Sequence, residues 1–265
     1  MVNDDIEFRT IDGEPLLGRL YRPRDGRCVA AVIDVHGGGW VGADRLDNAV
    51  IDRTLAEHGV AVFAIDFRMP PKAPFPAALE DVNYAIRWLK ANTGRLGLET
   101  PAIGGLGTSS GGHLLLVNAL QPELYAPVEP ALRVVDATLD FVVAAWPVAD
   151  PLARYRMVKE RGVQHLIDAH HSFWPDEAAM MRVNPQGMLD RDETVVLPPM
   201  LVLQGTADHN LDHTRSDVFA ASYRRRGGAV ELVKFDGAPH SFIAREPRSD
   251  AAQEGLRRIV EFVTG

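Results

Sequence analysis

The pattern that most constrains the fold is an alternation of short apolar runs with longer amphipathic stretches from residue 29 onward. Short apolar runs bounded by turn residues predict buried strands, and the amphipathic stretches predict helices. Strands and helices that alternate along a chain form a mostly parallel sheet with helices on both faces. We therefore expect an α/β protein with strands at 29–35, 60–65, 102–106, 138–146, 200–204 and 230–235, and helices near 46–58, 77–91, 110–120, 214–226 and 250–263.

Two more strands are predicted before this alternation begins. The runs 6–11 and 16–21 flank Asp12-Gly13-Glu14-Pro15, a turn sequence typical of a hairpin. They bring the predicted sheet to eight strands. A chain of 265 residues with 46% hydrophobic content can bury one large core, so we expect a single domain over residues 1–265.

One stretch interrupts the alternation. Between Trp146 and Pro198 about fifty residues show no strand pattern, which is far longer than an ordinary connection. We interpret 147–197 as a helical insertion before the late strands. Its helix-capable pieces, 152–163 and 177–183, and its aromatic segment 170–175 suit a lid over a pocket and equally suit a packed helical excursion.

Composition excludes several classes of function. The chain has 28 lysines and arginines against 36 aspartates and glutamates, a net charge of −8, so its surface repels nucleic acid. No run approaches the roughly 18 apolar residues of a membrane span, and the acidic N-terminus is unlike a signal peptide. The single cysteine, Cys28, has no partner for an intrachain disulfide. We expect a cytoplasmic protein without nucleic-acid or membrane partners, and the sequence leaves open whether it forms a homo-oligomer.

A serine in a glycine-rich turn is the first candidate for catalysis. Gly107-Thr108-Ser109-Ser110-Gly111 follows one predicted strand and precedes a predicted helix. In that context a Gly-x-Ser-x-Gly turn holds its central serine in a strained conformation, and the glycines avoid collisions with neighbouring backbone. This register selects Ser109 as the nucleophile and not Ser110. Glycine-rich turns that merely cap a helix are common, so the motif alone does not establish catalysis.

A second glycine-rich segment predicts an oxyanion hole. His36-Gly37-Gly38-Gly39-Trp40 ends the predicted strand 29–35, and three glycines let bare backbone approach an acyl oxygen. We expect the donors to be the N–H groups of Gly38, Gly39 and Ser110. We interpret His36 as a structural residue that braces the loop, and Trp40 as either a core residue or a wall of the acyl pocket.

The base and its acid are predicted from their positions after the late strands. Asp208 follows the strand 200–204, and His240 follows the strand 230–235. The chain order serine, acid, histidine is that of the Gly-x-Ser-x-Gly hydrolases, and open α/β sheets carry their sites at the carboxyl ends of strands. We therefore predict Asp208 as the orienting acid and His240 as the base.

The remaining histidines do not indicate a metal. His209 and His213 lie beside Asp212 where a loop and a helix start are expected, and the histidines of the insertion lack the His-Glu-x-x-His spacing. We predict no metal site, and a serine-histidine-aspartate mechanism needs no cofactor.

With these motifs in order, the chain resembles the hormone-sensitive-lipase-like and related small bacterial carboxylesterases of the α/β-hydrolase superfamily. The resemblance rests on HGGGW at 36–40, DFRMPPKAPFPAALEDV at 66–82, GTSSGG at 107–112, and the pair Asp208 and His240. It implies the α/β-hydrolase fold and covers the chain from about residue 29 to its end. The turn carries Thr-Ser-Ser where Asp-Ser-Ala is usual. The short chain also resembles formamidase-like and feruloyl-esterase-like relatives.

The predicted function is a serine hydrolase that cleaves small to medium acyl or aryl carboxylic esters through an acyl-enzyme. The substrate is a small-molecule ester or amide. The alternatives are an amidase or formamidase with the same triad, and a non-catalytic ligand receptor on an esterase scaffold. Trp40, Phe173 and Trp174 are candidates for contact with a flat substrate group and are equally suited to the core.

Overall fold

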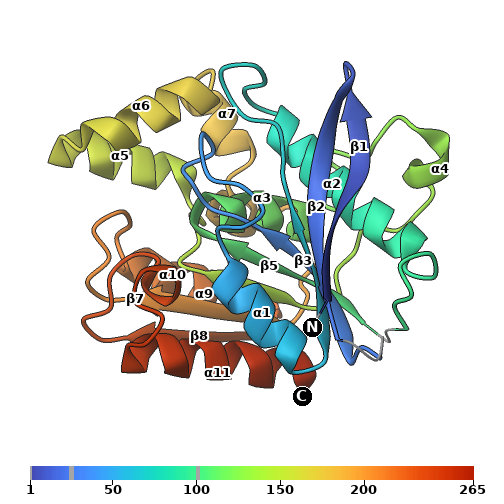
Figure 1. The fold of residues 1–265 in the computed structure, drawn as a ribbon. Coiled ribbons are helices and arrows are strands. Elements are labelled where there is room, and N and C mark those ends of the chain that lie inside the picture. The colour runs from blue at the N-terminus through green and yellow to red at the C-terminus, as the bar shows by residue number, and fades with distance from the viewer. Residues whose placement is uncertain (1, 24–26, 100–101) are drawn as a thin grey trace.

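The computed structural model describes residues 2–23, 27–99 and 102–265, and these form an eight-stranded sheet in the order β1-β2-β4-β3-β5-β6-β7-β8 (Figure 1). The predicted mostly parallel sheet with helices on both faces is confirmed. The strands are β1 (Val2–Ile11), β2 (Glu14–Arg22), β3 (Ala30–Val35), β4 (Val60–Ile65), β5 (Ile103–Thr108), β6 (Val142–Ala145), β7 (Met200–Gly205) and β8 (Val230–Phe235).

The sheet changes direction at one place. β1 and β2 form the predicted hairpin around Asp12 and Gly13, both with positive φ, and β2 pairs antiparallel with β4. All pairings from β4 to β8 are parallel. Because β4 and β5 lie on opposite sides of β3, the strand order reverses at β3 and β5. Open α/β sheets bind their ligands at such a point, beyond the carboxyl ends of the strands.

Burial explains why the central strands were recognisable as continuous apolar runs. Every residue of β3, β4, β6 and β7 is buried, as expected for parallel strands covered on both faces. The predicted strand 138–146 is shorter, at 142–145. Asp140 accepts the N–H of Ile103 with its side chain just before the strand, and Trp146, at φ +41°, ends it.

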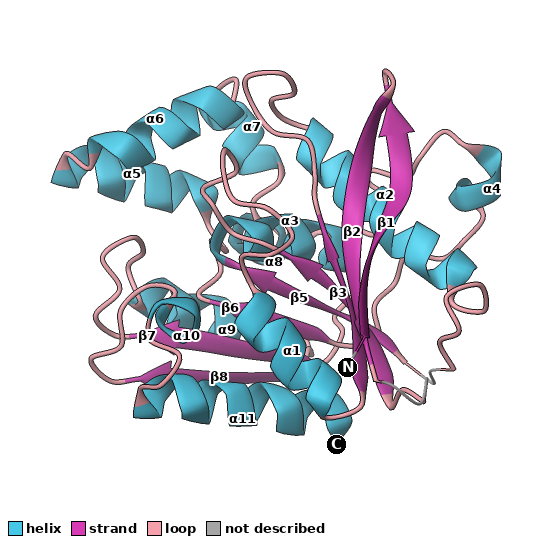
Figure 2. Cartoon of the chain, viewed as in Figure 1, coloured by secondary structure: helices cyan, strands magenta, loops and turns pink. Residues whose placement is uncertain are grey.

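Helices lie on both faces of the sheet (Figure 2). α1 (Ala49–Glu57) and α11 (Asp250–Thr264) contact each other on one face, and α2 (Ala77–Asn92) and α3 (Ser109–Leu120) contact each other on the other. Every residue of α3 is buried, so this helix is central to the core. The other helices outside the insertion are α4 (Pro130–Arg133), α9 (Thr214–Arg225) and α10 (Phe242–Arg245).

The segment between β6 and β7 contains four helices: α5 (Pro151–Arg161), α6 (Gln164–Phe173), α7 (Glu177–Arg182) and α8 (Pro185–Asp190). α5, α7 and α8 each begin at a side-chain cap, because Asp150, Asp176 and Asn184 accept an N–H of the first turn. α5 contacts α6 and α7, and the three project at the upper left of Figure 1. α8 instead packs between α3 and α9, so the predicted insertion divides into a lobe, α5 to α7, and a helix of the main body.

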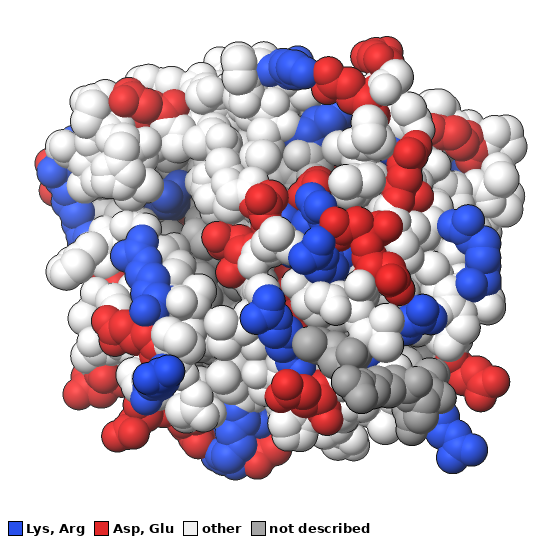
Figure 3. Space-filling model, in the orientation of Figure 1, with Lys and Arg blue, Asp and Glu red and all other residues white. Residues whose placement is uncertain are grey.

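Charges of both signs are interspersed on the face drawn in Figure 3, over the hairpin and the nearby helices. That face therefore carries no continuous basic surface of the kind that nucleic acid requires. Within the part of the chain that the structure describes, no helix combines the length and the apolar character needed to cross a bilayer.

The N-terminus of α3 lies against the end of β3. A Cβ atom added at Gly111 would lie 2.1 Å from the carbonyl oxygen of His36 and 2.2 Å from that of Val35. Both neighbours are main-chain atoms in the core of the sheet. They have no room to withdraw, so a glycine is required at this position.

We predict that Gly111→Ala lowers the melting temperature by roughly 3–10 °C, since overpacking a core of this kind costs about 1–3 kcal/mol. Thermal unfolding followed by circular dichroism measures the change. Gly94→Ala is the matched control, because nothing lies within 4 Å of an added Cβ at that exposed turn. Equal melting temperatures for the two variants would contradict the close contact.

Candidate active site

The turn between β5 and α3 presents Ser109 as predicted. Ser109 has φ +52°, a strained value for a serine, and α3 begins at this residue. A Cβ at Gly107 would approach the carbonyl oxygen of Gly111 to 2.9 Å, and one at Gly37 would lie 3.3 Å from the Cβ of Ser109. The glycines thus allow the tight turn and bring the glycine loop after β3 alongside Ser109.

Ser109, His240 and Asp208 form a continuous hydrogen-bonded chain. Nε2 of His240 lies 2.9 Å from Oγ of Ser109, and Nδ1 lies 2.7 Å from Oδ2 of Asp208. The exposed fractions of the three residues are 7%, 7% and 6%. An ionised carboxylate can only accept, so Nδ1 carries the proton and Nε2 is free to accept the serine hydroxyl proton. The structure therefore brings the three predicted residues together from the turns after β5, β7 and β8.

The environment of Asp208 favours its ionised form. Burial acts to raise the pKa of Asp208, but the hydrogen bond and charge of His240, with donors from Gln204 and Asn210, hold that pKa below its ordinary value. Oδ1 accepts the N–H groups of Asn210 at 2.8 Å and Leu211 at 2.9 Å. Gln204 donates to Oδ2 at 3.0 Å. The carboxylate is thus fixed in orientation as well as in charge.

The glycine loop after β3 leaves two amides available. Gly38 and Gly39 have φ of +95° and +65°, and a Cβ at Gly38 would lie 2.0 Å from the carbonyl oxygen of Gly42. The Gly38 carbonyl accepts the N–H groups of Val41 and Gly42, which closes the loop on itself. Gly38 is exposed, and no acceptor among the described residues takes the N–H of Gly38 or Gly39. The N–H of Ser110 is in the first turn of α3, where helices leave donors unused.

Side chains brace this loop from below. Oγ of Ser110 accepts the N–H of Trp40 at 3.1 Å, so Ser110 links the loop to α3. His36 bonds the Gly37 carbonyl through Nδ1 at 2.9 Å and stacks on Phe67 at 4.3 Å. Burial lowers the pKa of His36, which keeps its ring neutral. These contacts match the structural role predicted for His36.

The three predicted substrate-contacting aromatics are buried. The exposed fractions of Trp40, Phe173 and Trp174 are 0%, 0% and 4%. Trp40 stacks on Phe173 with centroids 5.5 Å apart, and Trp174 meets both rings edge-on. Nε1 of Trp40 donates to His113, which bonds the carbonyl of Val183. These side chains join the glycine loop to the end of α6 by packing, which is the core alternative of the sequence analysis.

The described residues contain no group of three or more His, Cys, Asp or Glu side chains placed to hold a metal ion. His170 and His171 instead make ring contacts and hydrogen bonds with α5, where Nε2 of His171 lies 2.7 Å from the hydroxyl of Tyr155.

Two contributors to the site were not predicted. Gln204, which donates to Asp208, is the penultimate residue of β7 and accepts the hydroxyl of Ser216 at 3.0 Å. A polar residue at the carboxyl end of a buried strand is a signal that could have identified it. Arg154 on α5 is 5% exposed and lies with its guanidinium carbon 5.3 Å from the Trp40 ring centre. Nothing in its sequence context separates it from the other arginines of the insertion.

Comparisons with known proteins identify a family and several proteins to which this chain is similar. Residues 19–223 match the model of the family described as BD-FAE. The ethyl acetate hydrolase of Pseudomonas putida is 29% identical over 273 residues, which cover 97% of this chain and 80% of that protein. Mouse hormone-sensitive lipase is 33% identical over 136 residues, 51% of this chain and 17% of that protein. The matched part of this chain covers 59%, 59% and 52% of the lengths of three further curated relatives.

A solved esterase of Pyrobaculum calidifontis superposes with a TM-score of 0.82 at 24% identity, over 99% of this chain and 84% of that one. This likeness shows the fold, and the predicted α/β-hydrolase fold is confirmed. The predicted resemblance to hormone-sensitive-lipase-like esterases is also confirmed.

A buried polar network lies behind Ser109. Thr108, the residue before Ser109, donates to Asn48, and Asn48 donates to Asp34 of β3 at 2.8 Å. Asp34 and Asp52 of α1 are 1% and 0% exposed. Burial raises the pKa of Asp34 to about 7 and raises the pKa of Asp52 well above its ordinary value, where the neighbouring Asp34 raises it further. The folded protein therefore retains protons on this pair that an unfolded chain would release.

This pair predicts a pH dependence of stability. Unfolded aspartates titrate near pH 3.9, so between about pH 4 and 7 the folded state binds more protons and the free energy of unfolding falls as pH rises. Asp52→Asn removes one titrating group and keeps its shape. We expect the stability of the variant relative to wild type to increase from pH 5 to pH 8, as measured by urea unfolding. Glu57→Gln, an equal charge change on the exposed side of the same helix, is the control. A stability difference between Asp52→Asn and wild type that stays constant with pH would contradict the raised pKa values of this aspartate pair.

Proposed function

Since the chain belongs to the BD-FAE family and is a carboxylic ester hydrolase of the α/β-hydrolase fold, we propose that it acts through a Ser109-His240-Asp208 triad. One observation carries the proposal. An unbroken hydrogen-bonded chain runs from Oγ of Ser109 to the carboxylate of Asp208, and it starts at a serine held at φ +52°. That is the arrangement by which a histidine activates a serine for attack on an acyl carbon.

In the first half of the reaction, Nε2 of His240 takes the proton of Ser109 as Oγ attacks the ester carbonyl. Asp208 stabilises the imidazolium that forms and holds the Nδ1–H tautomer. His240 then returns the proton to the departing alkoxide, which leaves as the alcohol. The product of this half is an acyl-enzyme on Ser109. A water molecule then gives a proton to Nε2 of His240 as it attacks the acyl-enzyme. His240 returns this proton to Oγ of Ser109, and the carboxylic acid is released.

The negative charge of each tetrahedral intermediate is held by main-chain donors. We assign this role to the N–H groups of Gly38, Gly39 and Ser110. Support comes from the two loop amides that have no acceptor among the described residues and from the position of Ser110 in the first turn of α3. The partial positive charge of that helix end adds to the stabilisation. Loss of one such donor typically costs about a hundredfold or more in rate.

We propose that the substrates are esters with small to medium acyl groups. The name of the Pseudomonas relative, an ethyl acetate hydrolase, supports a short acyl chain. The packing of Trp40, Phe173 and Trp174 supports it too, because these rings fill the space between the glycine loop and α6. The helices α5 to α7 form the cap in this proposal, since the end of α6 contacts the glycine loop.

Replacement of the two adjacent serines tests the nucleophile. Ser109→Ala should lower kcat/KM about 10⁴-fold or more, because the attacking oxygen is lost. Ser110→Ala keeps its own backbone N–H but removes the acceptor of the Trp40 N–H, so a loss of about tenfold is expected. Intact-mass analysis with a fluorophosphonate should show one adduct on Ser109 in wild type and in Ser110→Ala. An adduct at another residue, or an active Ser109→Ala variant, would refute the assignment.

Acyl-chain selectivity tests the substrate class. A series of p-nitrophenyl esters of increasing chain length should give its highest kcat/KM at short or medium chains, with little turnover of long-chain triglycerides. Aryl formamides and anilides are assayed beside them. A maximum at long chains would contradict the compact site. A formamide that is cleaved faster than every ester would instead identify an amide or formamide hydrolase with the same triad.

A further inference from the structure

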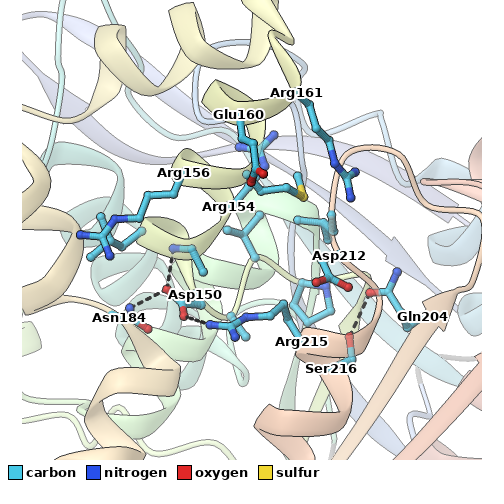
Figure 4. A pocket seen from close by; sticks show the side chains of 17 residues that line it. Asp150, Arg154, Arg156, Glu160, Arg161, Asn184, Gln204, Asp212, Arg215 and Ser216 are labelled. Carbon is cyan, nitrogen blue, oxygen red and sulfur yellow. Dashed lines mark hydrogen bonds and ion pairs between the residues drawn. The ribbon is translucent and has the colours of Figure 1, made fainter.

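A cavity of about 840 Å³ lies beside the reaction centre (Figure 4). Residues of α5, of the loop before it, and of the segment from β7 to α9 line this cavity. Val148 in its wall donates its N–H to the carbonyl of Ser109 at 3.0 Å, and Gln204 in its wall donates to Asp208 at 3.0 Å. Two residues of the cavity wall therefore contact Ser109 and Asp208, although neither Ser109, Asp208 nor His240 lines the cavity itself.

Arg154 is a buried cation in the wall of this cavity, and no anionic side chain among the described residues forms an ion pair with it. Its side chain enters between the Trp40 ring and the turn after Asp208, where Nε donates weakly to the carbonyl of Asn210 at 3.4 Å. Nη1 lies 3.1 Å from Nε2 of His170. Burial lowers the pKa of His170 to about 2, so that ring is neutral and supplies no charge. In the described part of the chain, no carboxylate lies within 4 Å of the guanidinium and nothing accepts from Nη2.

A second buried arginine, Arg87, shows how a guanidinium with a structural role is hydrogen-bonded in this fold. Arg87 is 0% exposed and makes five hydrogen bonds, to the side chains of Asn83 and Glu123 and to three carbonyls. Arg154 is 5% exposed, uses two of its five N–H groups and has no ion pair. A desolvated cation left without an anion is costly, because its hydration is lost and nothing replaces it.

The carboxylates in the cavity wall do not fill this role. Asp150 accepts the N–H of Ala153 and hydrogen bonds from Asn184 at 2.8 Å and Arg215 at 2.6 Å; dashed lines in Figure 4 mark the contacts with Asn184 and Arg215. Asp212 accepts the N–H and hydroxyl of Thr214. Glu160 and Arg161 are exposed neighbours of opposite sign. The charge of Asp208 favours the charged form of Arg154, but Asp208 makes no direct contact with it. An anion in direct contact with Arg154 would therefore be supplied by a ligand.

We propose that Arg154 binds a carboxylate of the substrate, so that the preferred ester is anionic. Such an ester is either a half-ester of a dicarboxylic acid or a hydroxy acid that is acylated on its hydroxyl group. This inference rests on the proposed triad, because it places the carboxylate next to a scissile ester held at Ser109. A planar guanidinium with free N–H groups suits a carboxylate, and the burial of Arg154 strengthens the contact.

Two substrate pairs test the proposal. Monoethyl glutarate is compared with ethyl 5-methylhexanoate, and 4-acetoxybutanoate with 4-methylpentyl acetate; in each pair an isopropyl group replaces the carboxylate. Wild type should favour the anionic ester of at least one pair by about tenfold or more in kcat/KM. The first pair places the carboxylate on the acyl side and the second on the alcohol side, so the preferred pair identifies its location.

Arg154→Met should remove that preference, and Arg154→Lys should retain part of it, since lysine keeps the charge and loses the planar fork. Arg156→Met is the matched control. Arg156 lines the same cavity, but its side chain is 66% exposed and pairs with Glu177, so the preference should persist. If Arg154→Met does not fold, the lysine variant decides the result.

Glutarate provides a readout independent of turnover. It should inhibit wild type competitively and bind Ser109→Ala in calorimetry, with about tenfold weaker binding when Arg154→Met is added and a smaller loss when Arg154→Lys is added. Neutral esters hydrolysed without any anionic preference, or a preference unchanged in the Arg154 variants, would overturn this inference and leave the proposed triad standing. Failure to hydrolyse any ester would overturn the triad itself.

Discussion

Where β3 and β5 end side by side, the main chain of His36 and Val35 lies so close to Gly111 that no side chain fits between them. This contact joins two glycine-rich turns into one unit. One turn holds Ser109 at positive φ and the other holds the amides of Gly38 and Gly39 open. Because main-chain atoms make the contact, the geometry of the site depends on the sheet itself and not on side chains that can change rotamer.

The buried ionisable side chains around that unit are stabilised in three ways. Asp208, whose pKa is held below its ordinary value, receives four hydrogen bonds, which suits the orienting acid of the proposed triad. Arg87 is fully bonded and links α2 to the chain before β6. Asp34 and Asp52 retain protons, so little net charge is buried behind the nucleophile. Arg154 follows none of these patterns, and it faces the cavity of about 840 Å³.

The sequence allowed prediction of the features set by main-chain periodicity and glycine. The eight strands, the turn at Ser109, and the positions of Asp208 and His240 after β7 and β8 follow from local patterns, because buried parallel strands are continuous apolar runs. Other features depend on contacts between distant segments. The shortening of β6 reflects the side chain of Asp140 bonding to Ile103, and the burial of Trp40 depends on α6, more than a hundred residues later. Local patterns carry no signal for such pairings.

The division of the insertion into a lobe and a helix of the main body suggests which segment of this protein could be replaced as a unit. α8 packs between α3 and α9 and returns the chain to β7, whereas α5 to α7 contribute no strand to the sheet. The chain leaves the main body at Asp150 and rejoins it at Asn184, and these two side chains are hydrogen-bonded to each other at 2.8 Å. The two points where the chain enters and leaves the lobe thus lie side by side, while Arg154, Phe173 and Val183 make further contacts with the main body. A segment transplanted between Asp150 and Asn184 from a related esterase would arrive with its ends already at the correct separation, which makes this lobe a natural unit of exchange in evolution and in engineering.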